Sequence, residues 1–163
     1  METFSTGARV DALREVVLYQ GEAAKKSHRQ LFSLGDGCYQ SVCGNMSESI
    51  LSVDLENVSK LHISAGWEAM LEVALWTTGK PTVHEVLGLL RKSGVTDQEL
   101  VPFAKSEVRD IFPWLYYARR FDVLRKVCNT AKAKTEMRLA RKNVLVYCHM
   151  VSEEIEKIVA SNL

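Results

Sequence analysis

The stretch that decides the expected fold is residues 82–100, TVHEVLGLLRKSGVTDQEL. It contains the pattern Thr-x-x-Glu twice, once from Thr82 to Glu85 and once from Thr96 to Glu99. In such a capping box the threonine hydroxyl accepts a hydrogen bond from a free N–H in the first helical turn, and the glutamate accepts one from the N–H of the threonine. Two successive helices are therefore predicted, the first of which ends at Ser93-Gly94.

The clearest break in the chain lies immediately before this stretch, in the sequence TTGKP of residues 77–81. Gly79 suits the left-handed position that follows a helix, and Pro81 cannot continue one. We treat residues 1–163 as one helical unit. The break also allows a division into N-terminal helices, residues 1–78, and C-terminal helices, residues 81–163.

Apolar residues recur at helical spacing in most of the remaining sequence. The spacing predicts helices over residues 8–34, 47–61 and 65–78, and again from Pro113 to near the end of the chain. In the last of these the apolar stripe changes phase after Asn129-Thr130, which predicts a break or kink there. No hairpin turn signal interrupts the pattern. The predicted fold class is all-α, a bundle of seven or eight helices or two closely packed helical halves.

The composition is that of an ordinary globular protein, with 47% apolar and 25% charged residues. No stretch approaches the roughly 18 uncharged apolar residues that a membrane span requires. Cys128 and Cys148 fall at apolar positions, where a free thiol packs as a small hydrophobic group. We therefore expect an intracellular protein, cytoplasmic in the first instance, with reduced thiols.

Charge is distributed very unevenly along the chain. Residues 119–142 contain nine basic and two acidic residues, a net charge of +7, whereas residues 1–118 and 143–163 have net charges of −4 and −2. A strongly basic segment is information about partners, not about fold. On a helical wheel, the candidate nucleic-acid-binding residues that share one face are Arg119, Arg120, Lys126, Lys134, Arg138, Arg141 and Lys142.

Three explanations of this basic face compete. It could be neutralised inside the molecule by residues 36–72, which hold six acids and one lysine. It could bind the phosphate backbone of a nucleic acid, RNA first, with little sequence specificity. It could also bind an acidic protein or an anionic membrane surface. We predict a non-enzymatic binding protein with RNA as its partner. The alternative is a helical adaptor or regulatory subunit that forms homo-oligomers through its apolar C-terminal segment, residues 144–158.

Catalytic and metal-binding motifs are not evident in the sequence. Because no two of the four histidines, His28, His62, His84 and His149, are four residues apart, no pair would share a helix face as metal ligands. A zinc site formed by Cys38, Cys43, Cys148 and His149 is disfavoured, since adjacent residues point to different sides of a helix. No cofactor, catalytic residue or metal is therefore predicted.

Overall fold

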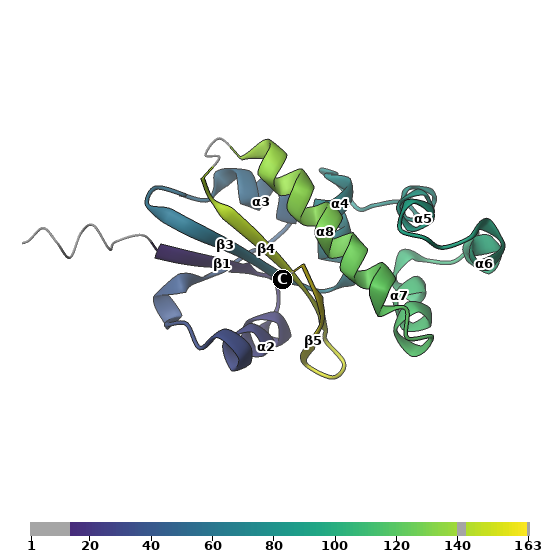
Figure 1. Ribbon diagram of the computed structural model, residues 1–163, viewed down its shortest axis with the longest axis horizontal. Coiled ribbons are helices and arrows are strands. Elements are labelled where there is room, and N and C mark those ends of the chain that lie inside the picture. Colours follow the sequence, from purple (N-terminus) through teal and green to yellow (C-terminus); the bar gives the residue numbers. More distant parts are fainter. Residues whose placement is uncertain (1–13, 140–142, 163) are drawn as a thin grey trace, which may run out of the picture.

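The computed structural model describes residues 14–139 and 143–162 and contains a mixed β-sheet, so the all-α prediction is wrong (Figure 1). Within these residues the strands are β1 (Arg14–Tyr19), β2 (Tyr39–Ser41), β3 (Val58–Ala65), β4 (Leu145–Ser152) and β5 (Lys157–Ser161). They lie in the order β2-β1-β3-β4-β5. The first four are parallel, and β5 runs antiparallel to β4.

The central strands were mistaken for helices because both of their faces are buried. Val16 and Leu18 belong to one apolar cluster, whereas Val17 and Tyr19 belong to the other. A strand buried on both faces is a continuous apolar run, and short runs of this kind cannot be told from helix segments by periodicity. The three central strands, with sequences REVVLY, VSKLHISA and LVYCHMVS, all have this character.

The described helices are α2 (Glu22–Phe32), α3 (Met46–Ser52), α4 (Trp67–Leu75), α5 (Val83–Lys92), α6 (Asp97–Leu100), α7 (Val108–Tyr117) and α8 (Phe121–Arg138). Helix α2 lies on one side of the sheet, and α3, α4 and α8 lie on the other (Figure 1). Helices α5, α6 and α7 extend beyond the end of the sheet. The molecule is therefore a layered α/β structure, not a helical bundle.

The C-terminal part of the predicted bundle is a β-hairpin. Residues 144–158, expected to form one apolar helix, enter β4 and β5, and Val146, Met150 and Val151 are buried in the sheet. The helical seam on which the self-association prediction rested does not form. The predicted break at Asn129-Thr130 is also wrong, because α8 continues through both residues.

Both predicted capping boxes are confirmed. The Thr82 hydroxyl accepts from the N–H of Glu85, and the Thr96 hydroxyl accepts from the N–H of Glu99, each at 3.2 Å. The second box opens only a four-residue helix. The break at residues 77–81 falls between α4 and α5. Among the residues that the structure describes, no helix has the length and apolarity needed to cross a membrane.

Candidate metal centre

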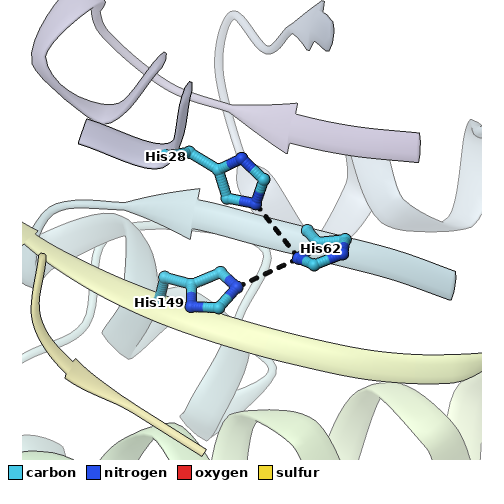
Figure 2. Close-up of side chains that lie close together, drawn as sticks. All are labelled: His28, His62 and His149. Atoms are coloured by element: carbon cyan, nitrogen blue, oxygen red, sulfur yellow. Dashed lines mark hydrogen bonds between the residues drawn. The ribbon is translucent and has the colours of Figure 1, made fainter. Parts of the chain in front are cut away.

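Three histidines meet between the sheet and α2, as Figure 2 shows. His28 comes from α2, His62 from β3 and His149 from β4. They are separated by as many as 121 residues in the chain, yet their side chains converge in one place. Their exposed fractions are 0%, 2% and 0%, respectively, so the cluster is closed to solvent.

The sheet register places two of the three histidines side by side. His62 pairs with Tyr147 across the β3–β4 ladder, and His149 lies two residues further along β4. Because side chains alternate between the faces of a strand, Tyr147 and His149 point to the same face as His62. The third histidine belongs to the buried face of α2, where Ala24 lies four residues before it and so shares one helical stripe with it.

One ring nitrogen of each histidine points to the centre of the cluster. The distance from His28 Nε2 to His62 Nδ1 is 3.0 Å, and that from His62 Nδ1 to His149 Nε2 is 3.1 Å. All three candidate donor atoms lie within 4.8 Å of one another. With Zn–N bonds of about 2.0–2.1 Å, tetrahedral coordination places neighbouring nitrogens about 3.3 Å apart. Shifts of a few tenths of an ångström would bring the two close pairs to that spacing.

The other ring nitrogen of each histidine faces an oxygen atom. His28 Nδ1 is 2.7 Å from the Tyr39 hydroxyl, and His149 Nδ1 is 2.7 Å from the Ser161 hydroxyl. His62 Nε2 is 3.1 Å from a carboxylate oxygen of Glu15. Metal-binding histidines almost always donate their second ring N–H to such a partner, which fixes the tautomer and orients the ring. The arrangement thus supplies both the ligands and the groups that orient them.

The three nitrogens at the centre of the cluster cannot all be satisfied by hydrogen bonds to one another. The Glu15 carboxylate only accepts, so His62 Nε2 is the N–H of that ring, and Nδ1 has a single lone pair. Two further ring nitrogens face that lone pair. If both carry protons, they compete for one acceptor. If one does, it forms a hydrogen bond to that lone pair and the other nitrogen has no donor. If neither does, lone pairs face each other. A cation at the centre would satisfy all three nitrogens together.

The environment keeps the three imidazoles neutral. Burial lowers the pKa of His28 to about 3, with a further contribution from the nearby His62. Burial likewise lowers the pKa of His149 to about 3, and His28 and His62 add to the effect. Burial also lowers the pKa of His62, although its hydrogen bond to Glu15 opposes the shift. Neutral imidazole is the form that binds a metal ion.

Aromatic rings surround the cluster. The centroid of the Phe32 ring lies 4.4 Å from that of His28, 5.1 Å from that of His62 and 5.0 Å from that of His149. The Tyr147 ring lies 5.2 Å from that of His62. Three imidazoles leave a fourth tetrahedral position, and Phe32 is close enough to all three rings to limit what can occupy it.

Those of the predicted basic residues that the structure describes have different surroundings. Lys126 and Lys134 line a cleft of about 480 Å³ between α5 and α8, together with Lys92. Arg120 forms ion pairs with Glu99 and Asp122 at 2.8 and 3.7 Å. Arg119 is exposed in the α7–α8 connection, and Arg138 lies over the Trp76 ring. Arg141 and Lys142 fall outside the described residues.

Internal neutralisation by residues 36–72 receives limited support. The acidic partners of Arg120 lie at residues 99 and 122, outside that range. Of the predicted basic residues within 14–139, Arg138 alone borders the acidic segment, in a shallow hollow that Asp54 and Glu56 also line. No ion pair in the described part of the chain engages Lys92, Lys126 or Lys134. Their charge remains available to an external anion.

The histidine cluster was missed because sequence spacing was tested only for helices. The available signal was a histidine at the centre of two apolar runs, KLHISA and VYCHMV. Of the cysteine–histidine set that the sequence disfavours, His149 belongs to the cluster. Cys148 packs in the apolar layer on the opposite face of the sheet.

The chain matches no known family, and no similar curated protein or solved structure was found. The case for a function therefore depends on the geometry of the described residues.

Proposed function

We propose that this protein binds one transition-metal ion, zinc in preference, through His28 Nε2, His62 Nδ1 and His149 Nε2. The observation that carries the proposal is the pairing of three convergent ring nitrogens with three outward ring nitrogens that each face an oxygen. Imidazole ligands suit zinc, copper, iron and nickel. Zinc fits best because it accepts three histidines at tetrahedral spacing and needs no change of oxidation state.

The ion would act mainly as a structural connection. It would join α2 to β3 and β4, and through Ser161 the hydrogen-bond network extends to β5. It would add to contacts that α2 already makes with the sheet, among them the hydrogen bond from the Ser64 hydroxyl to the carbonyl of Ala24 at 2.9 Å. A metal bound by residues so distant in sequence stabilises only the folded chain.

Equilibrium dialysis of the chelator-treated protein against zinc tests the proposal. We expect one zinc ion per chain, bound by the wild-type protein and by a His84→Ala variant, because His84 is exposed on α5. The His62→Ala variant should lose this ion. Substitution of cobalt for zinc in the wild-type chain gives a second readout that requires no mutation, since tetrahedral nitrogen coordination produces strong visible absorption.

Two results would overturn the proposal. One is a wild-type chain that retains no zinc and no cobalt after dialysis. The other is a His62→Ala protein, folded by circular dichroism, that still binds the ion. In either case the cluster would be a hydrogen-bonded part of the core.

A second candidate function is binding of a nucleic acid backbone, favoured by the three lysines of the α5–α8 cleft. Lys92, Lys126 and Lys134 line it with Asn129 and Thr130, whose side chains can also bond to phosphate oxygens. Each neutralised phosphate releases counterions, so such binding would weaken steeply as salt rises. The partner would be RNA, recognised with little dependence on sequence.

Replacement of Lys92, Lys126 and Lys134 by Ala is expected to weaken binding of a single-stranded RNA oligonucleotide. The slope of log K against log salt should become shallower by about 0.7 for each lost phosphate contact. Fluorescence anisotropy across a salt series measures both quantities. A variant with Lys80, Lys105 and Lys157 replaced instead has the same net charge, and its lysines are exposed elsewhere. Equal weakening of the two variants would rule out the cleft as the site.

A further inference from the structure

Another cavity lies at the carboxyl ends of the parallel strands, away from the histidines. It has a volume of about 400 Å³ and is lined by residues that follow β1, β3 and β4, among them Gly21, Gly66 and Glu153. None of its lining residues belongs to the histidine cluster. From β1 the chain continues to β2 on one side, and from β3 it continues to β4 on the other. In open α/β sheets, ligands bind in the crevice created by such a reversal.

Two helices begin at this cavity without a side-chain cap. Helix α2 starts after Gly21 and α4 starts after Gly66, and neither glycine can satisfy the free N–H groups of the first turn. These amides and the helix dipoles make the region favourable for an anion. Two helix starts on one cavity provide donors from two directions, which suits the several oxygens of a phosphate group.

A buried hydroxyl without a partner also lines the cavity. Ser152 at the end of β4 is only 6% exposed, and its side chain makes no hydrogen bond with any described residue. Buried polar groups are normally paired, so an unpaired one calls for an explanation. A bound ligand oxygen would supply the partner. Arg109, whose side chain is 70% exposed, also lines the cavity, and its guanidinium is ion-paired with Glu107 at 3.1 Å.

One wall of the cavity is aromatic. Trp67 and Phe112 line it, with ring centroids 5.8 Å apart. The indole N–H of Trp67 donates to the carbonyl of Val108 at 2.8 Å, which holds the ring in place. Aromatic side chains at the edge of a phosphate site are suited to a ligand with a flat ring.

Two acidic side chains, Glu68 and Glu153, line the cavity, and Glu153 competes for the anion position. The two carboxylate oxygens of Glu153 lie 3.5 Å and 3.8 Å from the points where a Cβ would stand on Gly21 and Gly66, respectively. Glu153 is exposed in the β4–β5 turn and forms no hydrogen bond or ion pair with the described residues. Its negative charge therefore lies beside both helix starts without being anchored to either.

We propose that this cavity binds a small phosphorylated molecule with a flat ring, such as a nucleoside monophosphate, and that Glu153 opposes this binding. The phosphate would lie between the starts of α2 and α4, with Ser152 as a further donor. The ring would lie against Trp67 and Phe112. This site goes beyond metal binding and does not depend on it.

Isothermal titration of the full chain with three probes tests the proposal. Adenosine monophosphate has both recognised groups, glycerol phosphate lacks the ring, and adenosine lacks the phosphate. We expect the first to bind about tenfold more tightly than either of the others, since stacking on an aromatic side chain and charge-assisted bonds each contribute this much or more.

The Glu153→Gln variant should bind adenosine monophosphate about tenfold more tightly than the wild type, because a like charge beside the phosphate is removed. Glu154→Gln is the matched control, since Glu154 lies in the same turn but its side chain contacts Tyr117 instead, at 3.4 Å. Ser152→Ala should weaken binding about tenfold. The proposal is overturned if Glu153→Gln and Glu154→Gln bind equally, or if the folded Glu153→Gln protein binds none of the three probes.

Discussion

Lowering the pH from 7 to 5 is expected to reduce the free energy of unfolding of the metal-free protein by about 4 kcal/mol. The loss comes from His28 and His149, whose pKa values burial lowers to about 3. Both side chains are fully buried, so solvent does not screen the effect. Urea unfolding of chelator-treated protein at a series of pH values measures it. The loss is large for a domain whose total stability is about 5–15 kcal/mol.

The direction of this change follows from the proton balance between the two states. In the unfolded chain each histidine takes up a proton as the pH falls below about 6.5, whereas in the folded chain His28 and His149 stay neutral until about pH 3. The unfolded state therefore binds more protons across this window. The stabilisation is complete above pH 6.5 and is lost as the pH falls towards 3. Each histidine contributes about 2 kcal/mol between pH 7 and 5.

Two variants identify the source of the pH dependence. A His28→Gln/His149→Gln double variant should be less stable at pH 7, but its stability should change much less between pH 7 and 5. His84→Gln, on the exposed surface of α5, should behave as the wild type does. A wild-type protein whose stability is flat over this range would contradict neutral, buried imidazoles.

The parts of the fold that the sequence predicted correctly are those whose hydrogen bonds join residues close together in the chain. The capping boxes at Thr82 and Thr96 were identified correctly because both partners of each hydrogen bond lie within four residues. The strands failed because the hydrogen bonds that define them are not local. Val17, for example, pairs with Tyr39 on one side and His62 on the other. With apolar residues on both faces, the alternation that reveals an exposed strand is lost.

The histidine cluster was not predicted because the strands that carry His62 and His149 were taken for helices. On a helix, Cys148 and His149 would point to different sides, so the sequence did not suggest a metal site there. In strand β4 they also point to opposite sides, but one side is the apolar layer under α8 and the other is the space that His62 and His28 share. Once two parallel strands are adjacent in a sheet, a histidine at the middle of each becomes a candidate pair. No sequence spacing could have located His28 over them, because that depends on how α2 packs.

The charge pattern was predicted only in part. The concentration of positive charge on residues 119–142 is a property of the sequence and needs no fold. Its division into paired and unpaired charges required the structure. Arg120 pairs with Glu99, which precedes it by 21 residues in a separate helix, whereas Lys126 gains Lys92 as a neighbour in the same cleft. A helical wheel cannot distinguish these two outcomes.

Zinc at a free concentration 1,000 times its Kd is expected to raise the free energy of unfolding at pH 7 by about 4 kcal/mol. The increase arises because the three ring nitrogens come from α2, β3 and β4 and converge only in the folded chain. Thermal or urea unfolding with and without zinc measures the change. The Glu15→Gln variant provides a sharper test, since Glu15 is the carboxylate that faces His62 Nε2 and its side chain is 33% exposed.

Loss of an orienting carboxylate typically weakens metal binding by about 10–100-fold. At the same zinc concentration Glu15→Gln should therefore retain about 1.4–2.7 kcal/mol of the stabilisation. His84→Ala should retain all of it, and excess chelator should remove it from every variant.

The Glu15 comparison separates a metal site from a polar cluster, because an ordinary core contact would affect stability equally with and without zinc. If zinc at this concentration stabilises the wild type and Glu15→Gln by the same amount, Glu15 does not orient a metal ligand. If zinc stabilises neither, the three imidazoles hold no ion.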